Sequence, residues 1–378
     1  MSVATKLPEP GPAPYFPALT GIRALAAWMV FFYHSNPLAT NSAGWRLLRE
    51  FNTGVALFFV LSGLLIGVRY LGRVELSGRW LAGYFRHRVA RIYPLFFLLT
   101  CAVIVVYHLA PAYDGGGRYW PFSSKGRLLL LGLNFSLLRG LFSEFRFTGI
   151  MAGWTLTVEE TFYVLAPLLL LGLWRWKAKW LVACAIGFLS LGCALVALPA
   201  TWHRYGFFDS YSFMLWGTFF GRCLEFLGGM YLAWRLLLWP TRAATAWPVY
   251  TLLGLAWWLG CLAVMAVVHA PGSQSAATEL TRIVLNNVVL VPGFLLLFYG
   301  LIHEASPLQR LLTGSFFTLL GKASYAFYLI HEGVPQQLLT QYVTPNLLLR
   351  FVITNLIAIL LYRFVEKPAY RWVISWRT

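Results

Sequence analysis

Long apolar stretches recur along almost the whole sequence, and they constrain its fold more than any other feature. About ten of them are long enough to cross a bilayer as helices. They lie at roughly 18–35, 52–70, 92–110, 155–173, 180–198, 214–237, 247–269, 284–302, 316–335 and 347–364. Hydrophobic residues make up 59% of the 378 residues and charged residues only 11%, whereas soluble domains are about one quarter charged. The sequence therefore predicts an all-α polytopic membrane protein with about ten transmembrane helices.

One further apolar stretch, at 127–139, is too short to span a bilayer comfortably. We interpret it as a re-entrant or interfacial segment inside a long loop. If it were a span, Arg175, Lys177 and Lys179 would lie outside. With ten spans and a cytoplasmic N-terminus, most Lys and Arg residues fall on the cytoplasmic side, as the positive-inside rule requires. Both termini are therefore expected in the cytoplasm.

The ends of the chain and its charge set further limits. Residues 1–14 are rich in proline and are expected to form a disordered cytoplasmic tail, leaving 15–378 as a single membrane domain. Arg23 interrupts the first apolar segment, which we interpret as a retained helix rather than a cleaved signal. The formal net charge of +17 is spread between apolar segments, which favours the lipid bilayer over nucleic acid as partner. The five cysteines show no metal-binding spacing, and we expect no metal.

Four ionisable residues inside the predicted spans are candidate catalytic groups, because such groups are costly in a membrane. His34 follows Arg23 by eleven residues, which is roughly 16 Å along a helix, so His34 lies at or beyond the midplane. Glu159 and Glu160 open the fourth span, and being about 100° apart they cannot share a helix face. His331 ends the ninth span at a similar depth. The structural alternatives are a helix-packing hydrogen bond for His34 and snorkelling for the two glutamates.

Two arginines near the start of the third span are candidates for binding a phosphorylated ligand. Arg88 and Arg91 are i and i+3, so on a helix they project from one face and could hold phosphates with paired guanidinium groups. The alternative is a basic cluster that contacts lipid headgroups. Arg222 and Glu225 have the same spacing in the sixth span and can pair with one another.

Several sequence blocks occur in order along the chain, from near residue 19 to near residue 368. They are Leu19–Leu25 with His34, Leu57–Gly63, Arg88–Pro94, Trp154–Tyr163, Ser324–His331 and Val365–Pro368. Together these blocks resemble the acyltransferase 3 family of integral-membrane O-acyltransferases. The chain departs from the family pattern at Thr20, where the family usually has Asp. It ends about ten residues after its last block, so we expect the membrane domain to act alone or with a separate partner.

The resemblance implies transfer of an acyl group from a CoA thioester, first of all acetyl-CoA, to a hydroxyl. It assigns Arg23, Arg88 and Arg91 to the donor side and His34 to the chemistry. Neutral imidazole suits proton abstraction near pH 7, so we interpret His34 as the general base.

The remaining ionisable candidates have supporting roles in this interpretation. Glu159 or Glu160 would orient the ring of His34. His331 or an arginine would stabilise the oxyanion. A transient acyl-histidine is also chemically possible.

The acceptor is left open between a cell-envelope glycan or lipid-linked sugar and a small cytoplasmic molecule. The outward depth of the histidines favours the first, and the resemblance implies a multi-pass protein of a bacterial inner membrane. Two other classes of protein are alternatives to an enzyme. One is a transporter or flippase that uses buried ionisable groups without covalent chemistry, and the other is a membrane scaffold. No related halves are seen in the sequence, as many transporters have, and a scaffold leaves the buried charges unexplained.

Overall fold

The computed structural model describes residues 14–113, 123–238, 247–268 and 275–376. Within these ranges the chain is helical, with one isolated bridge between Phe142 and Phe207 and no β-strand. The all-α prediction is therefore confirmed. The predicted tail, apart from residue 14, lies outside the described residues.

A helix occurs at each of the ten predicted spans. The long helices are α1 (Pro17–His34), α3 (Thr53–Tyr70), α4 (Gly78–Leu109), α6 (Trp154–Trp176), α7 (Ala178–Val196), α9 (Phe219–Leu238), α10 (Val249–Val268), α12 (Leu290–His303), α14 (Ser315–Ile330) and α16 (Leu347–Leu361). Shorter helices are α2 (Ala43–Leu48), α5 (Ser124–Phe135), α8 (Tyr211–Gly217), α11 (Ala276–Val284), α13 (Pro307–Thr313), α15 (Val334–Tyr342) and α17 (Lys367–Ser375). Two π-helical segments, η6 (Leu285–Val289) and η7 (Tyr362–Glu366), join α11 to α12 and α16 to α17.

Not every predicted span meets a simple criterion of length and hydropathy. Seven helical stretches of the described residues are long and apolar enough to cross a membrane, so the protein is a multi-pass membrane protein. The three helices that miss the criterion are α1, α9 and α14. Helix α14 has only 16 residues, α9 carries Arg222, Glu225 and Arg235, and Arg23 and His34 reduce the hydropathy of α1. The expected count of about ten and the orientation of the termini stay predictions.

The short apolar stretch at 127–139 contains helix α5 of 12 residues, followed by the 3₁₀ turn η2 (Arg139–Leu141). A helix of that length rises about 18 Å, well short of the roughly 30 Å of a hydrocarbon core. Its length agrees with the interpretation of this stretch as a segment that does not span.

Helices α3 and α9 pack closely against one another at glycine residues. A Cβ atom at Gly63 of α3 would overlap the backbone of Phe226 in α9, and Gly229 of α9 lies against the backbone of α3 in the same way. Gly67, one turn after Gly63, faces the side chain of Ala233. Helices α3 and α9 thus approach one another through small residues, as membrane helices commonly do.

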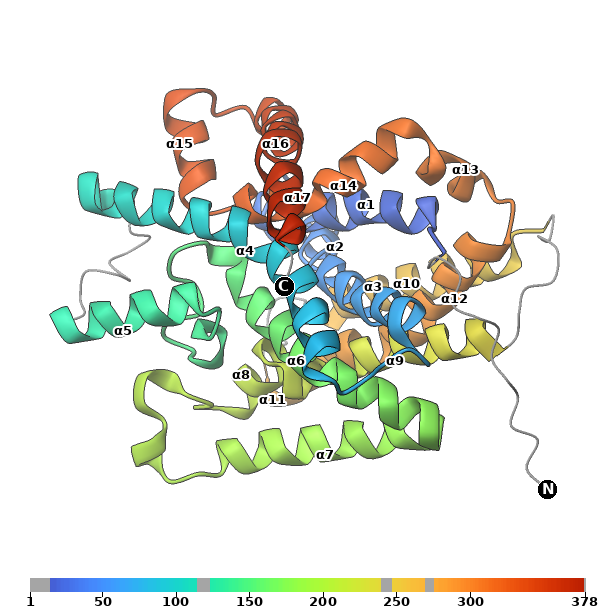
Figure 1. Ribbon diagram of the computed structural model, residues 1–378. Coiled ribbons are helices and arrows are strands. Elements are labelled where there is room, and N and C mark those ends of the chain that lie inside the picture. The colour runs from blue at the N-terminus through green and yellow to red at the C-terminus, as the bar shows by residue number, and fades with distance from the viewer. Residues whose placement is uncertain (1–13, 114–122, 239–246, 269–274, 377–378) are drawn as a thin grey trace, which may run out of the picture.

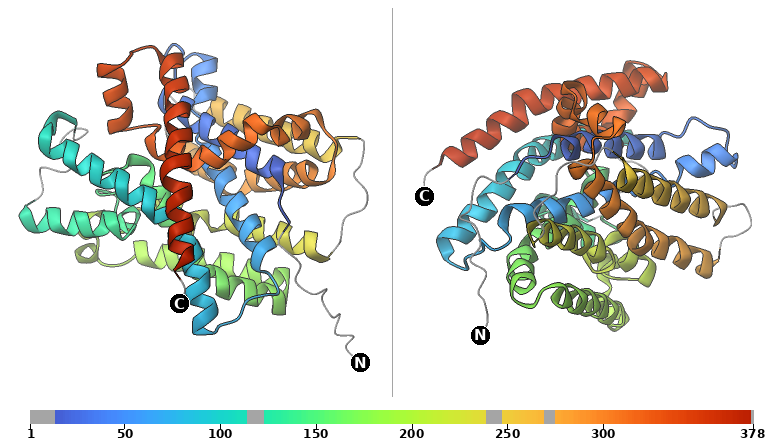
Figure 2. Two further views of the ribbon diagram at one scale, coloured as in Figure 1. Left: turned by 45° about the horizontal axis from the view of Figure 1, so that its top comes forward. Right: turned by 90° about the vertical axis from the view of Figure 1, so that its right-hand side faces the viewer.

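The helices that carry the candidate residues meet near the centre of the molecule. Helix α1 packs against α3 and α14, and α14 also packs against α16 (Figure 1). Figure 2 shows α16, η7 and α17 continuing as one long rod, which crosses α4. Helix α6 also contacts α3. Residues of helices α1, α3, α4, α6 and α14 together line a cavity at this centre.

Candidate active site

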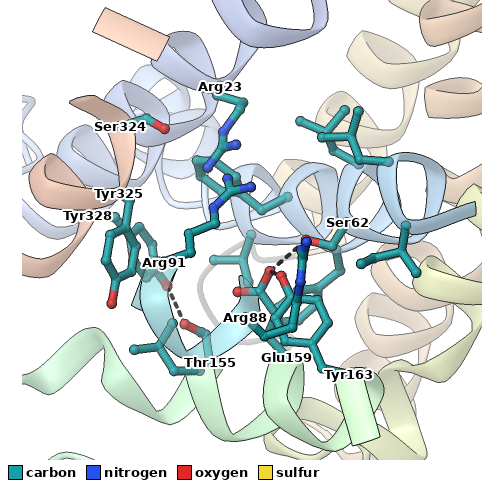
Figure 3. A pocket seen from close by; sticks show the side chains of 17 residues that line it. Arg23, Ser62, Arg88, Arg91, Thr155, Glu159, Tyr163, Ser324, Tyr325 and Tyr328 are labelled. Carbon is teal, nitrogen blue, oxygen red and sulfur yellow. Dashed lines mark hydrogen bonds between the residues drawn. The ribbon is translucent and has the colours of Figure 1, made fainter. Parts of the chain in front are cut away.

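Three cavities follow α1 from one of its ends to the other. The His34 cavity, of about 240 Å³, contains His34 and Glu332. The central cavity, of about 70 Å³, contains Glu159 (Figure 3). The Arg69 cavity, of about 360 Å³, contains Arg69 and lies at the start of α1. Val55 and Tyr328 line both of the first two cavities, and Arg23, Leu65, Arg88 and Arg91 line both of the last two. Neighbouring cavities therefore share parts of their walls.

His34, the last residue of α1, is paired with a carboxylate. Its Nδ1 atom is 2.9 Å from Oε2 of Glu332, and the side chains are 35% and 9% exposed. When the proton is on Nδ1, this nitrogen donates to the carboxylate and Nε2 keeps its lone pair. The arrangement is that of a base held by an acidic partner. Sequence reasoning missed Glu332, although it directly follows His331 in the chain.

The second histidine is a close neighbour of the first. The ring centroids of His34 and His331 are 5.2 Å apart, as their similar predicted depth suggested. His331 is 1% exposed, and its Nδ1 is 2.7 Å from the backbone carbonyl oxygen of Tyr328. Because a carbonyl only accepts, Nδ1 carries the proton in the neutral ring and Nε2 does not. That Nε2 is buried and has no hydrogen-bond partner among the described residues.

Glu159 and Glu160, the predicted partners of His34, do not contact it. Glu159 lines the central cavity, where the hydroxyl of Ser62 donates to it at 2.7 Å (Figure 3) and the hydroxyl of Tyr163 donates to the same oxygen. Glu160 is not among the residues lining the three cavities. The two side chains diverge because adjacent helical residues point in different directions. The expectation that Glu159 or Glu160 orients His34 is wrong in geometry, because Glu332 occupies that position.

The predicted arginine pair does share a face. Arg88 and Arg91 both line the central and Arg69 cavities. Arg88 is 7% exposed, and its guanidinium carbon lies 5.5–5.9 Å from the ring centroids of Tyr70, Tyr84 and Tyr163. Cation–π contacts of this kind hold a buried guanidinium in place without neutralising its charge.

The Arg69 cavity is strongly cationic. Glu366 is the one acidic residue among the described residues of its lining. It lies at the end of the π-helical segment η7, and π-helical turns often occur at functional positions. Figure 3 shows Arg23 and Arg91 reaching into the adjoining central cavity. The Lys and Arg residues that line the Arg69 cavity are Arg23, Arg69, Arg88, Arg91, Lys322 and Lys367. Such a lining suits a ligand that carries several phosphates.

A hydrogen-bonded pair separates the central cavity from the His34 cavity. The hydroxyl oxygens of Tyr328 and Thr155 are 3.1 Å apart (Figure 3). The ring of Tyr328 also lies 5.2 Å from that of His331 and 5.8 Å from that of Phe58. A ligand that extended from the Arg69 cavity to His34 would therefore pass beside Tyr328.

His34, His331 and Glu332 also have the composition of a metal site. One ligand atom from each lies within 4.8 Å of the others, whereas two nitrogen or oxygen ligands of a tetrahedral zinc ion are about 3.4 Å apart. The 2.9 Å contact between His34 and Glu332 has the length of a direct hydrogen bond. The geometry is thus accounted for by hydrogen bonding, and the absence of a functional metal stays a prediction.

The chain is similar over most of its length to several curated proteins. It is 25% identical over 401 residues to “Putative O-acetyltransferase SAR0937” of Staphylococcus aureus (strain MRSA252), covering 96% of this chain and 59% of that protein. It is 26% identical over 373 residues to “Putative peptidoglycan O-acetyltransferase YrhL” of Bacillus subtilis (strain 168), covering 94% and 55%. It is 28% identical over 327 residues to “Putative acetyltransferase ORF330” of Acidianus two-tailed virus, covering 84% and 82%.

The chain spans less than three fifths of the length of the two bacterial relatives. No solved structure matches it significantly. The model of the acyltransferase 3 family, which is described as “Acyltransferase domain”, matches residues 16–364, and the chain therefore belongs to this family.

Proposed function

We propose that the protein transfers an acyl group from acyl-CoA, with acetyl-CoA as the first candidate, to a hydroxyl of a carbohydrate-containing envelope acceptor. The observation that carries the proposal is the His34–Glu332 pair, which lies at one end of a row of three neighbouring cavities with a cationic lining at the other end. A paired histidine is what hydroxyl activation needs, and a cationic cavity is what CoA phosphates need.

The donor would enter at the Arg69 cavity. The CoA phosphates would bind Arg69, Arg88, Arg91 and the neighbouring lysines, with the acyl-bearing arm in the central cavity. The thioester would then reach His34 beside Tyr328. This arrangement keeps the polyanionic part of the donor at one end of α1 and the reacting carbonyl at the other.

The chemistry would be general-base catalysis by His34. Glu332 accepts the Nδ1–H bond and fixes the ring, so that Nε2 takes the acceptor proton as the hydroxyl oxygen attacks the thioester carbon. A carbon–oxygen bond forms, the carbon–sulfur bond then breaks, and the departing thiolate takes the proton from the imidazolium.

The oxyanion of the intermediate needs a donor or a positive charge. The neutral form of His331 has no proton on Nε2, because its proton is on Nδ1. We therefore assign oxyanion stabilisation to a guanidinium of the His34 cavity. Arg222 is the best held of these, because Glu225 binds it through two hydrogen bonds of 2.7 Å.

We place the Arg69 cavity on the cytoplasmic side, where CoA is available, and the His34 cavity on the opposite side of a bacterial inner membrane. Both termini are then cytoplasmic. A glycan or lipid-linked sugar of the envelope is the acceptor class that fits this orientation. The name of the Bacillus subtilis relative, which refers to peptidoglycan, supports the same class.

The test uses purified protein in nanodiscs with radiolabelled acetyl-CoA, and compares the wild type with His34→Ala. We expect the wild type to release CoA and to label an added envelope extract, and the variant to do neither. Binding of acetyl-CoA without CoA release in the wild type would favour transport over acyl transfer. If acetyl-CoA does not bind, the donor assignment is wrong.

A further inference from the structure

Four arginines line the His34 cavity, although they come from four distant parts of the chain. Arg49 follows α2, Arg146 precedes the 3₁₀ turn η3 (Met151–Gly153), Arg222 is in α9 and Arg282 is in α11. Among the described residues that line this cavity, the single carboxylate is Glu332, which is paired with His34. The lining therefore carries an excess of positive charge that the chemistry at His34 does not explain.

Two of these arginines have acidic partners behind the cavity wall. Arg222 forms a bidentate pair with Glu225, and both are buried. Arg282 lies 3.3 Å from both carboxylate oxygens of Glu50. These pairs fix the two guanidinium groups and reduce their net charge.

The other two arginines are held by aromatic rings. The guanidinium of Arg49 lies 4.8 Å from the ring of Trp45, and no carboxylate of the residues that the structure describes lies within ion-pair distance of it. Arg146 lies 4.5 Å from the ring of Phe147 and 5.4 Å from that of Phe213. Cation–π contacts orient a guanidinium while leaving its positive charge in place. Arg49 therefore presents a positive charge to the cavity.

Aromatic side chains form much of the remaining wall. Tyr33, Phe147, Trp154 and Trp216 line the same cavity. Aromatic faces offer flat apolar surfaces against which the C–H face of a sugar ring can pack. The volume of about 240 Å³ is slightly below the roughly 300 Å³ at which pockets for drug-sized ligands begin. The cavity therefore suits one sugar unit rather than a stretch of polysaccharide.

We propose that the acyl acceptor is a sugar carrying a negative charge, as a carboxylate or a phosphate, close to the hydroxyl that is acylated. This inference rests on the proposed function, because it takes His34 as the base that activates the hydroxyl. The anion binds Arg49, on the wall that Arg146 also lines. The sugar ring packs on the aromatic wall, and the hydroxyl faces Nε2 of His34. The four arginines outnumber Glu332, the one carboxylate among the described residues of the lining.

The experiment measures equilibrium binding to the full chain in nanodiscs at low salt, where charge interactions are least screened. The ligands are methyl glucoside, methyl glucuronide and methyl glucoside 6-phosphate, which share one ring and differ in charge. We expect at least one charged sugar to bind about tenfold or more tightly than the neutral one, as one charge-assisted hydrogen bond predicts. Whichever charged sugar binds more tightly identifies carboxylate or phosphate as the source of the anion.

Three matched variants locate the effect. Arg49→Gln should remove the preference for the charged sugar while CoA binding is kept, which also shows that the variant is folded. Arg69→Gln should weaken CoA binding and keep the sugar preference. Arg204→Gln, at an exposed arginine that lines none of the three cavities, should change neither.

Equal binding of neutral and charged sugars by the wild type would overturn the inference. A preference that survives in Arg49→Gln and in Arg146→Gln would also overturn it, because the anion would then bind elsewhere. The proposed function fails by a different readout, which is the absence of CoA release. A charge preference in binding without CoA release would keep the sugar site and remove the acyl transfer.

Discussion

The two ends of the cavity run are both rich in arginine, yet they are built differently. At the Arg69 cavity the cations come from helices α1, α3, α4, α14 and α17, and Glu366 is the one acidic residue among the described residues of the lining. At the His34 cavity the arginines come from distant segments, aromatic rings line much of the wall, and a histidine–glutamate pair is present. Positive charge alone therefore does not distinguish donor binding from catalysis. We therefore propose donor binding at the first end and chemistry at the second.

The largest expected effect comes from removing the base. His34→Gln keeps a polar side chain but cannot take a proton, so we expect the rate of acyl transfer to fall by about 10²- to 10⁴-fold. Binding of acetyl-CoA should stay unchanged, because the donor phosphates are held at the other end. Single-turnover rates and equilibrium binding measured on one preparation would check both. A matching loss of donor binding would break the division between the two ends.

The next largest effect is expected at Glu332. Glu332→Gln removes the charge that orients His34, and we expect a loss in kcat on the order of a hundredfold. Glu159→Gln is the matched comparison, since Glu159 binds Ser62 and Tyr163 instead of His34, and it should lower kcat less. If Glu159→Gln proved the more damaging change, the assignment of Glu332 would be wrong.

A smaller effect is expected at the donor end. Arg91→Gln removes one guanidinium from the lining that the central and Arg69 cavities share. We expect the KM for acetyl-CoA to rise about tenfold with little change in kcat, as for the loss of one charge-assisted contact. Steady-state kinetics with varied acetyl-CoA would show this, with Arg204→Gln as the control. A fall in kcat at unchanged KM would move Arg91 from binding to chemistry.

The smallest expected effect is that of chelation. Because the contact between His34 and Glu332 has the length of a direct hydrogen bond, treatment with EDTA should leave acyl transfer unchanged. The assay is CoA release before and after dialysis against the chelator. Loss of activity that added zinc restores would instead make His34, His331 and Glu332 metal ligands.

Much of the fold could be predicted from sequence, because membrane helices depend on local apolar length. A helix is found at each predicted span, but α9 and α14 show where that reasoning weakens. Helix α9 holds the buried pair Arg222 and Glu225, and α14 has only 16 residues. Packing against neighbouring helices stabilises such elements, and hydropathy does not register this.

The candidate site was predictable where its residues share a helix. The spacing of Arg88 and Arg91 correctly predicted that they share one face. His34 and His331 were predicted at a similar depth, and the structure brings their rings together. The partner of His34 was missed, since Glu332 contacts it only through the packing of α1 against α14. Glu159 was predicted as a site residue from its position within a span, but it accepts hydrogen bonds from Ser62 and Tyr163 and not from His34.

The cluster of arginines around His34 was also beyond sequence reasoning. Arg49, Arg146 and Arg282 lie in separate connecting regions or short helices and share no motif. Only the tertiary fold brings them to one cavity. From the sequence alone, each of these arginines could be explained as an ordinary charged residue between predicted spans.

The most direct test of the division between the two ends is acyl transfer across a sealed membrane. The protein would be reconstituted into liposomes with a sugar acceptor trapped inside and radiolabelled acetyl-CoA added outside. We predict labelled acceptor inside the liposomes and free CoA outside, with both signals lost in His34→Gln. Transfer that occurs only when donor and acceptor are on the same side would contradict the account.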